Sequence, residues 1–186
     1  LVFIHGFLSG REYWHKQQLL QQYAELFFVE LPGYGNLGGE NSCDSIEAFA
    51  KAAVQQIDQN NIDHFDLIGH SMGGMIAQEV VKLAGERIDR LILFGTGAIG
   101  DIPSRFEPIE TSLTKASADF FDQDVRKAVA SWFLDYEGSD DFDAALRLAS
   151  KASFSTYYKG LNAMKNWSNI ENLAAIKQET LLLWGD

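Results

Sequence analysis

Residues 64–74, His-Phe-Asp-Leu-Ile-Gly-His-Ser-Met-Gly-Gly, constrain the fold of this chain more than any other stretch. A short apolar run at 65–68 predicts a strand, and the residues after Ser71 have helical spacing. The pattern Gly69-x-Ser71-x-Gly73 places a hydroxyl at the turn between them, where small neighbours let the two backbones approach closely. The segment is therefore predicted to be a nucleophile elbow with Ser71 as the candidate nucleophile.

Apolar runs that read as strands alternate with helical patterns along most of the chain. The runs are continuous rather than alternating, which is typical of parallel strands covered on both faces. This rhythm predicts an α/β fold with a mostly parallel sheet and helices on both faces. The expected strands are residues 1–5, 26–31, 65–68, 88–95 and 180–184, and the expected helices are 11–24, from Ser42 or Asp44 to 60, and 72–84 with a left-handed stop at Gly85.

The rhythm is interrupted between residues 101 and 169, where only helical patterns occur. They cover residues 113–121, 125–136, 142–152 and 156–167. We therefore expect a core formed by residues 1–100 and 170–186, with 101–169 inserted as a helical cap. The insertion is rich in aromatic residues, which predicts either an apolar acyl pocket over Ser71 or simply the core of a helical layer. They are Phe106, Phe120, Phe121, Trp132, Phe133, Tyr136, Phe142, Phe154, Tyr157, Tyr158 and Trp167.

Composition narrows the classes of function. The 186 residues carry a net charge of −11, which argues against binding to nucleic acid or to an anionic membrane surface. No apolar run is long enough to span a membrane. The one cysteine, Cys43, excludes an internal disulfide and a cysteine-based metal cluster, and makes the cytoplasm the default expectation.

Both ends of the chain are expected to cut through structure. The first residues, Leu-Val-Phe-Ile, already read as the middle of a buried strand, and the last, Leu-Leu-Leu-Trp-Gly-Asp, are a strand followed by nothing. The sequence is therefore interpreted as a fragment of a longer protein.

Several stretches together resemble the α/β-hydrolase family in its small, single-domain, cap-bearing form. Their order and spacing match the family over the whole chain, which would then hold the family's third to seventh strands, with the insertion after the sixth. The matching stretches are Val2-Phe-Ile-His-Gly-Phe, Glu30-Leu-Pro-Gly-Tyr-Gly, Gly69-His-Ser-Met-Gly-Gly, Arg90-Leu-Ile-Leu and Thr180-Leu-Leu-Leu-Trp-Gly-Asp.

The resemblance implies an oxyanion hole made by the backbone N–H groups of Phe7 and Met72. Acyl transfer needs such donors, an activated nucleophile and a proton shuttle. Gly6 would permit an unusual backbone that aims the next N–H inward. The expected turn and elbow glycines are Gly6, Gly69 and Gly73.

The proton shuttle is harder to place. In this family the order along the chain is serine, acid, histidine, whereas every histidine here precedes Ser71 or adjoins it on the N-terminal side. His70 is expected to point away from the Ser71 oxygen, toward the pocket floor or the sheet. The other histidines are His5, expected to be structural, His15 on a surface helix, and His64 at the start of a strand.

The catalytic acid follows the seventh strand in the family, in a Gly-Asp-x-Asp type segment. Asp186 would be the first acidic position of that segment, so the catalytic acid and the histidine are both expected beyond the end of the chain. Asp101, after the sixth strand, is an alternative acid position.

Other chemistry lacks its signature here. Gly33-Tyr-Gly35 lacks the third glycine and the helix that dinucleotide binding needs, and no His/Asp group has the spacing of a metal site. We therefore expect no cofactor and no metal. A serine at position 71 also argues against the dehalogenase and epoxide hydrolase relatives, which carry aspartate at the elbow.

The sequence thus predicts a serine hydrolase that cleaves a small apolar carboxylic ester or a related acyl bond through an acyl-enzyme on Ser71. Within the family the alternatives are a C–C bond hydrolase or enol-lactonase of aromatic degradation, and a lyase similar to the menaquinone-pathway synthase. An alternative from another class is a ligand receptor or scaffold that keeps the fold but has little turnover.

Overall fold

A five-stranded parallel sheet forms the centre of the computed structural model, which describes residues 1–102 and 107–185. The strand order is β2-β1-β3-β4-β5, and every neighbouring pair is parallel. The predicted α/β class is confirmed, and each expected strand is present near its predicted place. The strands are β1 (Val2–Ile4), β2 (Phe27–Val29), β3 (Phe65–His70), β4 (Ile88–Phe94) and β5 (Glu179–Leu183).

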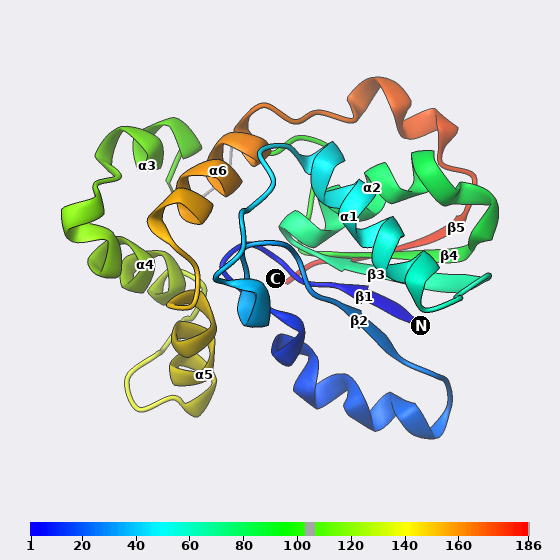
Figure 1. Ribbon diagram of the computed structural model, residues 1–186, viewed down its shortest axis with the longest axis horizontal. Coiled ribbons are helices and arrows are strands. Elements are labelled where there is room, and N and C mark those ends of the chain that lie inside the picture. The colour runs from blue at the N-terminus through cyan, green and yellow to red at the C-terminus, as the bar shows by residue number, and fades with distance from the viewer. Residues whose placement is uncertain (103–106, 186) are drawn as a thin grey trace.

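Helices cover both faces of the sheet. In Figure 1, α1 (Ile46–Gln59) and α2 (Met72–Ala84) lie above the strands and η1 (Arg11–Gln22) lies below them. The helix α1 starts two residues after Asp44, because Ser45 is its N-cap and the Ser45 hydroxyl accepts a hydrogen bond from the Ala48 N–H. The expectation that Ser42 or Asp44 caps this helix is therefore wrong.

Two other local expectations are also wrong. Residues 11–24 were expected as a regular surface helix, but η1 covers only Arg11–Gln22 and is a 3₁₀ segment interrupted by non-helical backbone at Trp14. At this break the Trp14 side chain is buried and lies beside Phe3, with ring centroids 5.1 Å apart. Gly85 has φ −58° and leads into a 3₁₀ turn, η3 (Gly85–Arg87), instead of a left-handed stop.

The helical insertion between β4 and β5 lies beyond the carboxyl ends of the strands, at the left of Figure 1. Its first helix begins four residues earlier than predicted, at Ile109, and ends at Lys115. The other helices lie within a few residues of their predicted places. They are η4 (Ala118–Phe120), α4 (Phe121–Ala130), α5 (Asp140–Ala149) and α6 (Phe154–Lys165), followed by η5 (Ile170–Ala175).

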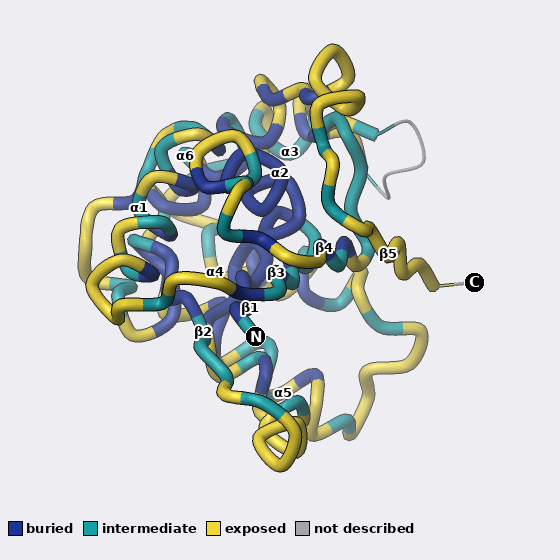
Figure 2. The backbone as a smooth tube through the Cα atoms, turned by 90° about the vertical axis from the view of Figure 1, so that its right-hand side faces the viewer, coloured by how far each residue is buried: buried dark blue, intermediate teal, exposed yellow. Residues whose placement is uncertain are grey.

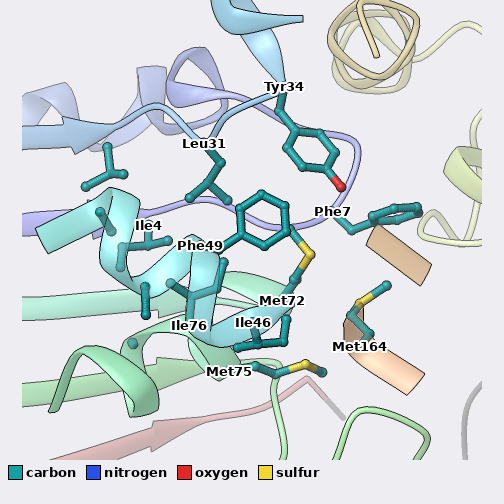
Figure 3. Packing of buried hydrophobic residues seen from close by; sticks show 14 of the residues in the cluster. Ile4, Phe7, Leu31, Tyr34, Ile46, Phe49, Met72, Met75, Ile76 and Met164 are labelled. Atoms are coloured by element: carbon teal, nitrogen blue, oxygen red, sulfur yellow. The ribbon is translucent and has the colours of Figure 1, made fainter. Parts of the chain in front are cut away.

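The most deeply buried helix is α2. Figure 2 shows this helix in dark blue at the centre of the molecule and β5 in yellow at the edge. α2 packs on the sheet on one side and against α1 and the return from the insertion on others. Figure 3 shows how Met72 and Ile76 of α2 lie beside Phe49 of α1. The residue that precedes α2, Ser71, is therefore held by the best-packed part of the fold.

Candidate active site

Ser71 occupies a sharp turn between β3 and α2. Its backbone has φ 54° and ψ −121°, a conformation that non-glycine residues rarely adopt. The Ser71 N–H donates to the Phe94 carbonyl oxygen at 2.9 Å, which fixes the turn to the end of β4. The backbone therefore has the strained strand-to-helix turn that the sequence pattern predicts.

The glycines on either side of Ser71 are required by space. A Cβ on Gly69 would overlap the carbonyl oxygen of Gly73, and a Cβ on Gly73 would overlap the carbonyl oxygens of Ile4 and His5. These obstacles are all backbone atoms, which cannot rotate away as a side chain can. The glycine pattern thus allows β1, β3 and α2 to meet directly beneath Ser71.

Met72 is the first residue of α2, so its N–H has no acceptor within the helix. Further along the helix, the N–H groups of Gly74 and Met75 both donate to the Ser71 carbonyl oxygen, at 2.9 and 3.3 Å. The Met72 side chain is buried and points into the core beside Phe49 (Figure 3). The backbone of Met72 is consequently at the turn while its side chain anchors the helix.

The Gly6–Phe7 peptide lies next to the turn. A Cβ on Gly6 would come within 3.2 Å of the Ser71 Cβ, so these residues are immediate neighbours. Gly6 does not have a positive φ, so its absent side chain supplies space rather than the unusual backbone that we expected. Instead, Leu8 has a positive φ, of 52°.

His5 orients this peptide. Its Nε2 accepts the Leu31 N–H at 3.1 Å, so Nδ1 carries the proton and donates to the Gly6 carbonyl oxygen at 2.9 Å. In a planar trans peptide the C=O and N–H point in opposite directions, so the Phe7 N–H points away from the His5 ring. Burial lowers the pKa of His5 to about 4, which keeps the ring neutral near pH 7.

His70 stacks flat on Tyr13, with ring centroids 5.0 Å apart and an interplanar angle of 8°. Phe94 and Trp14 contact the same imidazole from other sides. Burial lowers the pKa of His70 to about 4, so the ring is neutral near pH 7. His70 thus forms part of an aromatic wall, and no hydrogen bond joins it to the Ser71 hydroxyl within the described chain.

The remaining predicted residues lie apart from Ser71 or outside the described chain. His64 is exposed, with its Nδ1 3.5 Å from a carboxylate oxygen of Asp89. Asp101 accepts the Ile109 N–H at 3.2 Å and so caps the start of α3. Asp186 lies outside the described residues, as does Phe106.

A cavity of about 1200 Å³ opens beside Ser71, between the sheet and the insertion. The side chains of His15 and of four of the insertion's aromatic residues line it, whereas Phe142 and Trp167 do not. Charged residues of η1 and of the insertion also reach the cavity, and one ion pair, Lys16–Asp141 at 2.7 Å, joins η1 to α5. The lining aromatic residues of the insertion are Trp132, Phe133, Tyr136 and Tyr157.

Sequence reasoning missed several residues of this region. Tyr13 was expected only as part of the surface helix at 11–24, yet it forms the cavity wall with His70. Gln78 and Glu79 are buried on α2 and are bonded to the chain that returns from the insertion. The sequence does contain a sign of Gln78 and Glu79, because they are two adjacent polar residues within the apolar pattern of α2.

Within residues 1–102 and 107–185, no helix is long and apolar enough to cross a membrane. No group of three or more His, Cys, Asp or Glu residues there is arranged to hold a metal ion.

Comparison with known proteins identifies the family. The family model described as alpha/beta hydrolase fold matches residues 1–186. The chain therefore belongs to the α/β-hydrolase fold family, as its motifs predicted.

Its relatives include hydrolases with different reactions. The pimeloyl-[acyl-carrier protein] methyl ester esterase of Klebsiella pneumoniae (strain 342) is 26% identical over 155 residues, which cover 80% of this chain. The chain spans only 58% of that esterase's length. The 2-hydroxy-6-oxononadienedioate/2-hydroxy-6-oxononatrienedioate hydrolase of Escherichia coli is 26% identical over 202 residues, covering 100% of this chain and 69% of the hydrolase.

Solved structures agree on the fold. A thermophilic esterase from Thermogutta terrifontis superposes with a TM-score of 0.78, at 20% identity, over 99% of this chain and 70% of the esterase. At this identity the likeness concerns the fold alone. The family match and the solved structures together establish the α/β-hydrolase fold.

Proposed function

We propose that this protein is a serine hydrolase that cleaves a carboxylic ester or a related acyl bond through an acyl-enzyme on Ser71. The observation that carries the proposal is the strained backbone of Ser71 at the junction of β3 and α2, beside a large cavity. Such strain costs on the order of 1–3 kcal/mol and concentrates at functional sites. The named activities of the Klebsiella and Thermogutta relatives support the same reaction class.

In the proposed reaction the Ser71 oxygen attacks the carbonyl carbon of the ester and gives its proton to a base. The carbonyl oxygen becomes an oxyanion, which accepts hydrogen bonds from the N–H groups of Phe7 and Met72. The C–O bond to the alcohol then breaks, the alcohol takes up a proton, and water releases the acid from Ser71. Loss of one oxyanion donor costs about a hundred- to a thousandfold in rate.

The base is assigned to a histidine outside residues 1–186. A general base works best when its pKa is near the operating pH, and burial lowers the pKa of both His5 and His70 to about 4. His64 lies in an exposed pair with Asp89. His15 lines the cavity from η1, but no hydrogen bond joins it to Ser71 within the described chain. The acid is likewise assigned to a residue after Asp186, with Asp101 as the alternative.

The insertion is proposed to act as the cap of the active site. Trp132 and Tyr136, which lie between α4 and α5, and Tyr157 of α6 line the cavity beside Ser71, where they suit a small substrate with an apolar acyl part. In this proposal the core, residues 1–100 and 170–186, holds the nucleophile and the oxyanion donors, and residues 101–169 supply selectivity.

The test is a substrate panel on the intact natural protein and its Ser71→Ala variant. Simple p-nitrophenyl esters, an enol-lactone and a vinylogous diketone are compared, with melting temperature as the folding control. We expect ester turnover that falls at least a thousandfold in Ser71→Ala at an unchanged melting temperature. Ligand binding without turnover, unaffected by Ser71→Ala, would contradict the proposal and favour a receptor.

A second candidate is cleavage of a C–C bond. The Escherichia coli hydrolase aligns with all of this chain, which the Klebsiella esterase does not. Turnover of the diketone with none of the esters or the enol-lactone would favour this candidate over the esterase.

A further inference from the structure

Two short segments join the helical insertion to the core, and they lie side by side. The outgoing linker is residues 97–100, and the return linker is residues 167–169. The Gly100 N–H donates to the Trp167 carbonyl oxygen at 3.2 Å, and the Asn169 N–H donates to the Ala98 carbonyl oxygen at 2.8 Å. Ile99 and Ser168 form an antiparallel bridge between them. The insertion is thus attached through one short two-stranded ribbon.

This ribbon is fastened to α2 through a buried amide. The Gln78 side chain is 1% exposed, and its Nε2 donates to the Gly97 carbonyl oxygen of the outgoing linker at 2.9 Å. Its Oε1 accepts from Asn169 Nδ2 of the return linker at 3.1 Å. One side chain of α2 therefore holds both linkers at once.

The adjacent residue adds a second bond of the same kind. Glu79 is also buried, and its Oε1 accepts from the Trp167 indole N–H at 2.8 Å and from Lys82 at 2.6 Å. Buried polar groups are costly without partners, and hydrogen bonds fix one arrangement where apolar contacts alone would allow sliding. We call Gln78, Glu79, Trp167 and Asn169 the α2 clamp.

The clamp connects Ser71 to the far wall of the cavity. Gln78 lies two helical turns after Ser71, about 10 Å along α2. The helix α6 ends two residues before Trp167 and carries Leu161 and Met164 to the cavity. Close packing continues at this end of α6, because a Cβ on Gly100 would overlap the Met164 carbonyl oxygen. The position of α6 relative to Ser71 therefore depends on the clamp.

We propose that the α2 clamp is a set of positioning residues that fixes the wall formed by α6 relative to Ser71, and so sets selectivity for the length of the acyl chain. This inference rests on the proposed ester hydrolysis at Ser71. Long acyl chains reach Leu161 and Met164, whereas an acetyl group needs only the surroundings of Ser71.

The test compares kcat/KM for p-nitrophenyl hexanoate and p-nitrophenyl acetate, which share a leaving group, in the intact natural protein. Gln78→Met keeps the side-chain volume but removes both bonds to the linkers, and we expect the hexanoate-to-acetate ratio to fall about tenfold, mainly through KM for hexanoate. Trp167→Phe removes a single N–H and is expected to lower the ratio about threefold. Asn169→Leu combined with Gln78→Met should lower it no further than Gln78→Met alone, because both delete the same bond.

Gln56→Met is the matched control. The Gln56 side chain of α1 also makes two hydrogen bonds, in its case with the backbone N–H and carbonyl oxygen of Glu30, and neither bond goes to a linker. We expect a comparable loss of melting temperature with an unchanged ratio. A ratio within twofold of the parent in both Gln78→Met and Trp167→Phe would overturn the inference.

Hydrogen exchange supplies a readout that does not depend on activity. Amides of α6 and the return linker are expected to exchange at least tenfold faster in Gln78→Met than in Gln56→Met. Unchanged exchange in α6 would also overturn the inference. Absence of Ser71-dependent ester turnover in the parent protein would instead contradict the proposed function. The hydrogen-exchange rates alone would then decide whether the clamp positions α6.

Discussion

The nucleophile elbow and the helical insertion are shaped by different parts of the chain. At Gly69 and Gly73 of the elbow, the contacts that exclude larger side chains are with backbone atoms of α2 and of β1 and the residue after it. In the insertion the contacts are between rings, such as Phe142 with Phe133 and Tyr136. Backbone contacts admit almost no substitution, whereas ring packing can be rebuilt in many ways. In the proposed function, main-chain contacts would thus fix the site of the chemistry and side-chain packing would set the selectivity.

The largest effect is expected for Gly73→Ala, which tests whether the backbone contacts at the elbow exclude a side chain. The added Cβ would overlap two backbone carbonyl oxygens, so we expect a loss of about 3 kcal/mol or more in the free energy of unfolding. Urea unfolding measures the change. Gly138→Ala in the insertion meets no atom within 4 Å but sits at φ +72°, and should cost only about 1 kcal/mol. A Gly73→Ala variant as stable as Gly138→Ala would show that the elbow tolerates side chains.

In the insertion, Phe142→Ala is expected to lower stability locally. The ring is buried between Phe133, Tyr136 and the Arg126 guanidinium, so its removal should cost about 3 kcal/mol. We expect faster hydrogen exchange in α4 and α5 with unchanged protection in β3, because these rings do not reach the sheet. Equal loss of protection in β3 would mean that the two regions unfold as one unit.

Acid should destabilise the elbow region through its buried histidines. Burial lowers the pKa of His5 and His70 to about 4, so the unfolded chain binds protons more readily than the folded protein as pH falls from about 6.5 to 4. Each histidine then costs about 2 kcal/mol at pH 5 relative to pH 8. Glu30, whose pKa burial raises, acts in the opposite direction.

His70→Phe isolates one of these contributions. Phenylalanine can keep the stack on Tyr13 but cannot titrate, so we expect about half of the acid-induced loss to disappear. Urea unfolding of both proteins at pH 8 and pH 5 measures the difference. An identical loss in parent and variant would show that the folded protein readily accommodates protonated His70.

The smallest effect on stability is expected for Trp132→Ala. Trp132 is 49% exposed and lines the cavity, so its loss should change the free energy of unfolding by less than about 1 kcal/mol. We expect KM for p-nitrophenyl hexanoate to rise a few-fold relative to acetate. Leu134→Ala is the control, because Leu134 is exposed nearby and does not line the cavity. Equal KM changes in both variants would remove Trp132 from the proposed acyl pocket.

The difference between the two regions also explains what could be predicted from the sequence. The strands were found because a buried parallel strand is a continuous apolar run. The elbow was found because its backbone contacts demand glycine at 69 and 73. The start of the first insertion helix was predicted too late in the chain. Asp101 accepts the N–H at the start of this helix, and it lies outside the segment that carries the apolar pattern.

Long-range side-chain contacts were beyond the reach of the sequence. The stack of Tyr13 on His70 depends on the break in η1 at Trp14, which no local pattern indicates. The bonds from Gln78 and Glu79 span about ninety residues of chain, so their partners emerge only in the folded protein. Polar residues within an apolar helix pattern can be seen in a sequence, but what they hold cannot.

The most direct test of Ser71 as the nucleophile is covalent labelling of the intact natural protein with a fluorophosphonate, followed by intact mass measurement and peptide mapping. We expect one adduct per chain, located on Ser71, with loss of ester hydrolysis in proportion to labelling and no adduct in Ser71→Ala. Labelling of a different residue, or ester hydrolysis that survives in Ser71→Ala, would contradict the assignment of Ser71 as the nucleophile.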